Sequence, residues 1–126
     1  MEEYAHLRVY QASCELVEVG FALTQRFPRY HEKLKKQLDD AADSIGSNIA
    51  EGCGRKNNNH GNTELIRYLH MSFASANETQ HRIRTALIRQ FVTQKQYWSV
   101  YNRVHVIKKM LRAWVAKLEK DDRGRA

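Results

Sequence analysis

Helix-breaking residues are scarce in this chain of 126 residues. Proline occurs once, at Pro28, and glycine occurs at six positions. Proline lacks the amide hydrogen that a helix interior needs, and glycine weakens a helix by about 1 kcal/mol relative to alanine, so stretches without them favour long helices. The sequence therefore predicts an all-α protein. At this length, residues 1–126 are expected to form a single domain.

Apolar residues at helical spacing divide the chain into four segments. Phe27-Pro28 ends the first, because the residue before proline avoids helical geometry. A polar run with three consecutive asparagines, from Cys53 to Asn62, is predicted to be a loop of about ten residues. Asn62 is expected to cap the helix that follows. The predicted helices span about residues 7–26, 31–52, 62–90 and 94–120, followed by a frayed tail over 121–126.

The last predicted helix has the clearest start signal. Thr93 and Gln96 fit a capping box, and Val92 and Tyr97 fit a hydrophobic staple around it. Short connections favour an antiparallel up-down-up-down four-helix bundle, because helices joined by short loops pack side by side.

The first predicted helix has a wide apolar surface. Two neighbouring stripes cover about 200° of it at about 100° per residue, more than an outer helix of a monomeric bundle needs. This width indicates burial from two directions, and therefore an oligomer. The first stripe comprises Leu7, Tyr10, Cys14, Val17 and Phe21, and the second comprises Val9, Leu16, Leu23 and Phe27.

Composition is typical of a globular protein, with 42% hydrophobic and 28% charged residues. No segment resembles a membrane span, and the acidic N-terminus lacks the basic and then apolar order of a secretory signal. We therefore expect a cytoplasmic protein without a membrane partner. The two cysteines, Cys14 and Cys53, have neither the number nor the spacing of a disulfide framework or zinc site and are expected to be reduced.

The net charge of +7 favours a polyanionic partner, and nucleic acid is the first candidate. The last helix carries a basic stripe about 140° wide on the side away from its apolar face. Such residues contact phosphates without reading bases, so no sequence specificity is predicted. The alternative is an ordinary solvated helix face. The candidate nucleic-acid-binding residues are Lys109, Arg112, Lys117 and Lys120 on this helix, with Arg82, Arg89, Arg55 and Lys56 as extensions.

Catalysis has little support in the sequence. Two Glu-x-x-His pairs, Glu3 with His6 and Glu78 with His81, have the spacing of di-iron ligands. Such a site needs inward-pointing ligands, whereas Glu78 and His81 lie about 140° to 160° from the apolar stripe of their helix. No histidine or cysteine has the partner spacing of a nucleophilic site. We expect no metal, no cofactor and no enzymatic activity.

Residues 44–55 combine apolar, polar and glycine positions in one stretch. Ile45 and Ile49 are one turn apart and are predicted to be buried. Glu51 is placed to pair with Arg55 one turn later. Two glycines are expected to end the helix in left-handed conformations. The whole motif, interpreted as structural, comprises Ser44, Ile45, Asn48, Ile49, Glu51, Gly52 and Gly54, with Asn48 expected to satisfy backbone or side-chain groups.

This motif resembles the four-helix-bundle family that includes proteins encoded in intervening sequences of bacterial 23S ribosomal RNA genes. The resemblance covers most of the chain and includes Phe27-Pro28. It is strongest over Ser44-Ile45, the run from Ser47 to Gly52, and Gly54-Arg55, and it continues with Leu69, Ser75, Glu78 and Ile83.

The family resemblance implies a homopentameric barrel of bundles and no enzymatic activity. It also implies a fold similar to accessory proteins of diversity-generating retroelements, which associate with reverse transcriptase and nucleic acid. This chain departs from the family where Asp39 and Asp40 replace a common arginine, so the second helix is a poor RNA-facing surface.

Three functional hypotheses follow. The first is a non-enzymatic oligomeric scaffold that binds RNA or other nucleic acid through its basic surface and is linked to ribosomal RNA intervening sequences. The alternative is a protein–protein adaptor, such as a reverse-transcriptase accessory protein, that uses the wide apolar surface of the first helix. A cryptic hydrolase is a third possibility, which a nuclease assay with and without chelator tests.

Overall fold

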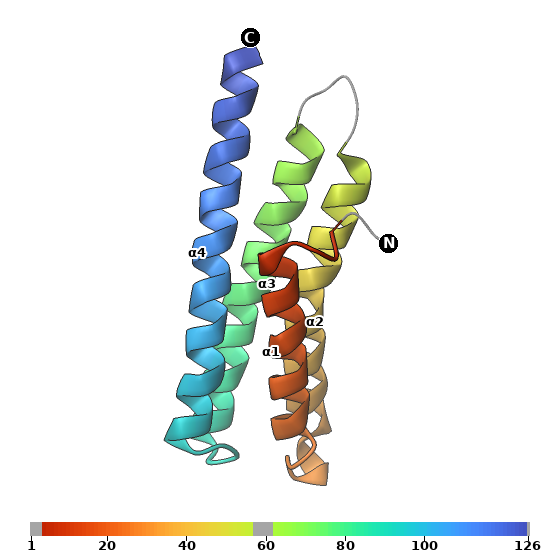
Figure 1. Cartoon of the computed structure of the whole chain (residues 1–126). Coiled ribbons are helices and arrows are strands. Elements are labelled where there is room, and N and C mark those ends of the chain that lie inside the picture. Colours follow the sequence, from red (N-terminus) through yellow and green to blue (C-terminus); the bar gives the residue numbers. More distant parts are fainter. Residues whose placement is uncertain (1–3, 57–61, 126) are drawn as a thin grey trace.

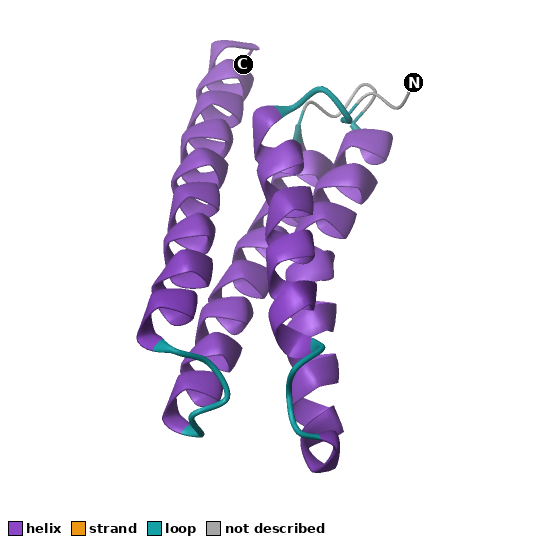
Figure 2. Ribbon diagram, turned by 60° about the horizontal axis from the view of Figure 1, so that its bottom comes forward, coloured by secondary structure: helices purple, strands orange, loops and turns teal. Residues whose placement is uncertain are grey.

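Long uninterrupted helices dominate the structure, as the scarcity of proline and glycine predicts. The computed structural model describes residues 4–56 and 62–125, and these contain helices and no strand (Figures 1 and 2). The elements are α1 (Arg8–Thr24), a 3-10 turn η1 (Arg29–His31), α2 (Glu32–Arg55), α3 (Thr63–Ile88) and α4 (Gln94–Arg125).

The helices pack side by side as a bundle. Among the described residues, α2 and α3 make the most extensive contact, and α1 also packs against α2 and α4, while α4 packs against α3. The connections from α1 to α2 and from α3 to α4 lie at the same end, at the bottom of Figure 1. The C-terminus lies at the other end, where α4 extends well beyond the start of α1.

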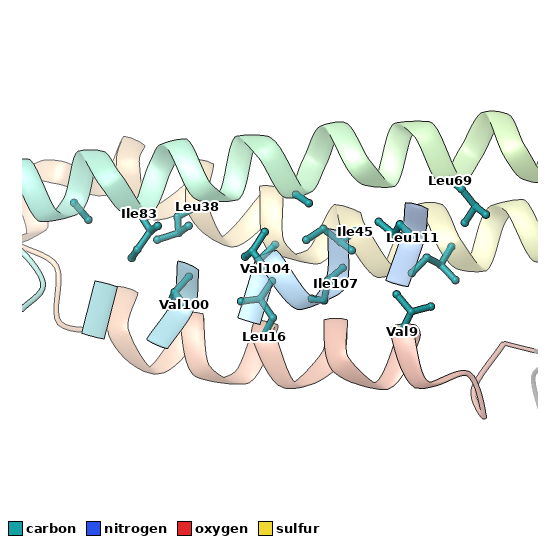
Figure 3. Close-up of a cluster of buried hydrophobic side chains, with 14 of the residues drawn as sticks. Val9, Leu16, Leu38, Ile45, Leu69, Ile83, Val100, Val104, Ile107 and Leu111 are labelled. Carbon is teal, nitrogen blue, oxygen red and sulfur yellow. The ribbon is translucent and has the colours of Figure 1, made fainter. Parts of the chain in front are cut away.

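The core lies along the axis of this bundle and draws apolar side chains from all four helices (Figure 3). Leu16 of α1, Ile45 of α2, Ile83 of α3 and Val104 of α4 are completely buried. Burying each such side chain stabilises the fold by about 1.5–3 kcal/mol. The predicted burial of Ile45 and Ile49 is confirmed, and Leu34, Leu38 and Ala41 of the same helix are also buried.

Helix α2 does not stop at Gly52, so the predicted end of that helix is wrong. The helix runs through Gly52 and Gly54 to Arg55, and neither glycine has a positive φ. Gly52 has a packing role instead. A Cβ atom added there would lie 2.9 Å from Cβ of Tyr68 and 3.0 Å from Cδ1 of Leu65, so glycine permits the close approach of α3. Of the predicted loop, residues 57–61 lie outside the described part of the chain.

Helix α3 ends at Ile88, two residues before the predicted end. Gln90 has a φ of 65° and occupies the position after the helix where glycine is usual. The amide of Gln90 donates to the carbonyl of Leu87 at 2.9 Å, and the amide of Phe91 donates to the carbonyl of Ala86 at 2.9 Å. This pair of hydrogen bonds is a Schellman motif, which turns the chain back toward the bundle.

The start of α4 matches the predicted capping box. The amide of Thr93 donates to Oε1 of Gln96 at 2.8 Å, and the amide of Gln96 donates to Oγ1 of Thr93 at 3.1 Å. Val92 and Tyr97, the predicted staple residues, are both buried in the core. The capping box prediction is therefore confirmed at the level of its hydrogen bonds.

The end of α4 does not fray where expected, because residues 121–125 continue the helix. Asp122 accepts hydrogen bonds from the backbone amide of Asn62 at 3.3 Å and from its Nδ2 at 3.0 Å. Asn62 does precede α3, but its side chain makes no capping bond to that helix. The carboxylate of Asp122, beside the positive end of the α3 dipole, joins the two helices instead.

Asp39 of α2 takes part in the contact with α1. It is half-buried, and its Oδ1 accepts a hydrogen bond from Oγ1 of the fully buried Thr24 at 2.7 Å. Lys35 pairs with its other carboxylate oxygen at 3.0 Å. The carboxylate of Asp39 accepts a hydrogen bond from the buried hydroxyl of Thr24 and so links α1 to α2.

Candidate nucleic-acid interface

Almost all of the net charge resides on α4. This helix contains nine lysines and arginines and three acidic residues, so it carries +6 of the +7 of the whole chain. The cations are spread along its length, and the phosphate backbone of a nucleic acid is the ligand that such a row of charges attracts.

The outer face of α4 is an exposed basic stripe. It comprises Lys109, Arg112, Lys117 and Lys120, all four exposed, with Lys109 and Lys120 opposite the buried Val104, Ile107 and Leu111 and with Arg112 and Lys117 on either side of them. Within the described part of the chain, Lys109, Lys117 and Lys120 form no ion pair. Their charges are therefore available to a ligand. Trp98, near the start of α4, is 49% exposed.

The seam between α3 and α4 adds Lys108 and Arg84, two cations that the sequence analysis missed. Lys108 lies over the ring of Phe73, 5.2 Å from its centroid, beside the predicted Arg112 at 4.8 Å, and Arg84 lies 5.6 Å from the ring of Tyr97. Lys108 Nζ also donates to Oε1 of Gln80 at 3.0 Å. Burial, followed by the charge of Arg112, lowers the pKa of Lys108 from its usual value. Helical periodicity alone does not reveal which side of α4 faces α3.

Arg55 and Lys56 do not extend the α4 stripe. They end α2, and α2 makes no direct packing contact with α4 in the described chain. Arg55 is already engaged: its Nε lies 2.8 Å from Oε2 of Glu51, as predicted, and its guanidinium lies 5.3 Å from the ring of Tyr68. The hydrogen bond to Glu51, followed by the charge of Tyr68, raises the pKa of Arg55.

Arg82 and Arg89 form a separate group. They lie on the side of α3 that faces α2 and line a recess with Lys33, at the end of the bundle where α2 begins. The eight cations predicted from sequence therefore fall into three groups rather than one surface, and the largest group is the four on α4.

Part of the motif in residues 44–55 lies in the contact between α2 and α3. Asn48 Nδ2 donates to the carbonyl of Ser44 at 2.9 Å and to its Oγ at 3.1 Å, and Ser75 Oγ donates to Ser44 Oγ at 2.9 Å. Ser72 Oγ donates to the carbonyl of Ile45 at 2.8 Å. These polar groups satisfy one another between the helices, which supports a structural role for the motif.

The potential metal pairs do not form a cluster in the described chain. Glu78 and His81 are both exposed, and Glu78 pairs with Arg82 at 3.5 Å. Glu3 lies outside the described residues. No group of three histidine, cysteine or acidic side chains is close enough to hold a metal ion in residues 4–56 and 62–125. No helix in these ranges is long and apolar enough to cross a membrane.

The two apolar stripes of α1 differ in burial. Val9, Leu16 and Phe27 of the second stripe enter the core. Tyr10, Cys14 and Val17 of the first stripe instead line a recess against Gly46 and Ser47 of α2, and Phe21 remains 49% exposed. We refer to Tyr10, Cys14, Val17 and Phe21 as the α1 outer stripe.

Comparisons with known proteins agree with the fold. A crystal structure at 1.70 Å of a protein with unknown function from the S23 ribosomal protein family of Bacteroides thetaiotaomicron is similar, with a TM-score of 0.74 and 24% sequence identity over 85% of this chain and 97% of that one. No curated protein matches the chain. The family model described as 23S rRNA-intervening sequence protein matches residues 5–113. The chain therefore belongs to the family of 23S rRNA-intervening sequence proteins.

Proposed function

We propose that this protein is a non-enzymatic, oligomeric scaffold that binds RNA through the outer face of α4, linked to a ribosomal RNA intervening sequence. The observation that carries the proposal is the concentration of charge on one helix, where Lys109, Lys117 and Lys120 are exposed and without ion pairs in the described chain. Family membership supports RNA as the polyanion.

Binding through this face depends on phosphate charge. Lysine and arginine on a regular helix release counterions from the backbone, and affinity falls steeply as salt rises. The stripe offers no arrangement of amides or carboxylates that would read base edges, so the expected binding tolerates sequence changes.

Fluorescence anisotropy with a labelled ribosomal RNA fragment, at low and moderate salt, tests the proposal. A variant with Lys109, Arg112 and Lys117 all changed to glutamate should bind at least about tenfold more weakly. The slope of log affinity against log salt should fall by about 2, since each phosphate contact to a single strand contributes about 0.7. The matched control changes Arg8, Arg26 and Lys36 to glutamate, because these are exposed cations on or beside α1 and α2.

The control separates a local interface from a general effect of net charge. Both variants change the net charge equally, so equal losses of affinity would contradict an interface on α4. No binding by the unmodified protein at low micromolar concentration would overturn the RNA-binding proposal itself.

We further propose that antiparallel up-down-up-down bundles assemble into a homopentameric barrel. The half-exposed α1 outer stripe supports burial by another copy, because contiguous apolar surface of this kind marks interaction sites. The same stripe favours the second candidate function, an adaptor such as a reverse-transcriptase accessory protein. A partner captured from a lysate after nuclease treatment, and lost when Val17 is changed to glutamate, would favour the adaptor.

A further inference from the structure

A recess of about 300 Å³ lies at the end of the bundle where η1 and α2 begin and α3 ends, at the bottom of Figure 1. Tyr30 and His31 of η1 and Lys33 and Gln37 of α2 form one wall. Arg82 and Arg89 of α3, two turns apart, form the other. The recess is therefore formed by η1 and the start of α2 on one side and by the end of α3 on the other.

The charge of this recess has one sign. Lys33, Arg82 and Arg89 are cations, and none of the described acidic side chains lines the recess, whereas three other recesses on the bundle each include an aspartate or glutamate. In the described chain, Lys33 and Arg89 form no ion pair, and Arg82 has Glu78 at 3.5 Å. Like charges held together repel one another, and a bound anion relieves that repulsion. Guanidinium groups match the geometry of phosphate oxygens in particular.

An aromatic wall adjoins these cations. The ring of Tyr30 lies 4.4 Å from that of His31, and His31 lies 4.6 Å from Phe91, which packs at 5.4 Å against the buried Phe27. The aromatic rings therefore run from the core to the rim of the recess. Tyr30 is 81% exposed, so one side of its ring is open to a ligand. Exposed aromatic rings beside cations bind nucleic acid bases by stacking.

The turn after α3 fixes this arrangement. The Schellman motif at Gln90 places Arg89 at the rim of the recess and turns Phe91 back onto His31. Glu32, in the first turn of α2, is exposed and does not line the recess.

We propose that this recess binds a nucleotide, with its phosphate held by Lys33, Arg82 and Arg89 and its base stacked on Tyr30. Two kinds of ligand carry a phosphate and a base in this arrangement: a free mononucleotide, and the 5′-phosphorylated end of an RNA strand. The site is distinct from the α4 stripe and does not depend on the proposed RNA binding by that stripe.

Isothermal titration calorimetry with adenosine 5′-monophosphate, adenosine and inorganic phosphate tests the site. We expect the monophosphate to bind at least about tenfold more tightly than either of the other two, since both halves of the site contribute. Arg89→Gln and Tyr30→Ala should each weaken this binding by at least about fivefold. Arg84→Gln is the matched control, because Arg84 is an exposed arginine of α3 outside the recess.

The two sources are separated with one short RNA carrying either a 5′-phosphate or a 5′-hydroxyl. A preference for the 5′-phosphate that Arg89→Gln removes indicates a strand end, whereas monophosphate binding without that preference indicates a free nucleotide. Changing Lys109, Arg112 and Lys117 to glutamate should leave monophosphate binding unchanged. Failure of the RNA-binding proposal for α4 can therefore be distinguished from failure of the nucleotide site. Equal binding of adenosine and its monophosphate, or no loss in Arg89→Gln, would overturn the nucleotide site.

Discussion

At the scale of single residues, Gln90 occupies a backbone conformation that suits glycine. Its φ of 65° costs a residue with a side chain about 1 kcal/mol. We therefore expect Gln90→Gly to stabilise the protein by up to about 1 kcal/mol, as measured by urea unfolding. The matched control is Gln25→Gly at the end of α1, where φ is −58° and glycine should destabilise by about 0.5–1 kcal/mol. A stability of Gln90→Gly equal to or below the unmodified protein would show that the turn is unstrained.

Two glycines of α2 are predicted to respond oppositely to the same substitution. A methyl group at Gly52 would meet Tyr68 and Leu65 of α3 at 3.0 Å or less, whereas no described residue lies within 4 Å of the corresponding position at Gly54. Gly52→Ala should destabilise by about 1–3 kcal/mol through overpacking. Gly54→Ala should stabilise by up to about 1 kcal/mol, because alanine favours a helix interior. Thermal unfolding of both variants tests this, and equal shifts would contradict close packing at Gly52.

At the scale of elements, Asp122 joins the last turns of α4 to the start of α3. Its carboxylate accepts hydrogen bonds from the amide and side chain of Asn62. Asp122→Ala should cost about 1 kcal/mol of local stability. Amide hydrogen exchange should then become about fivefold faster in the last two turns of α4. Asp121→Ala, which removes an exposed neighbouring carboxylate, should leave exchange nearly unchanged. Equal exchange rates in both variants would show that Asp122 does not hold the helix end.

The elements themselves were largely predictable from the sequence, because each depends on local patterns. The apolar repeat of α2 and the capping box at Thr93 are read within one or two helical turns. The errors arise where tertiary contacts override local preference. Gly52 looks like a helix stop but serves the contact with α3, and Asp122 looks like part of a frayed tail but bonds to Asn62, 60 positions earlier in the sequence.

The candidate site was less predictable, for the same reason. The basic stripe on α4 follows from periodicity within one helix. The recess of Lys33, Arg82 and Arg89 depends on which side of α3 meets α2. A list of cations by helix does not contain that information, so Arg82 and Arg89 were assigned to the wrong surface.

At the scale of the whole molecule, charge is divided unevenly between two halves of the bundle. Helices α1 and α2 together contain seven acidic and five basic residues, whereas α3 and α4 contain five acidic and twelve basic ones. The α1 outer stripe lies in the acidic half. Assembly through this stripe would leave the outer face of α4 accessible in every copy, and several copies of a weak phosphate-binding face bind one RNA more tightly than one copy does.

The role of the α1 outer stripe in assembly is tested by Phe21→Glu. Phe21 is 49% exposed in the single chain, so a glutamate there would not disturb the core. Lys35 Nζ lies 5.3 Å from its ring but already pairs with Asp39, so it does not supply a free partner for the new charge. We expect this variant to fold but to have a lower mass than the unmodified protein by size-exclusion chromatography with light scattering. The physical reason is that a charge buried at an apolar interface without a partner of opposite charge destabilises that interface by about 3–5 kcal/mol.

Val106→Glu is the matched control, because Val106 is equally exposed but lies on α4. Equal masses for the unmodified protein and Phe21→Glu would exclude the stripe as the subunit interface, and a loss of mass in Val106→Glu alone would place the interface on α4.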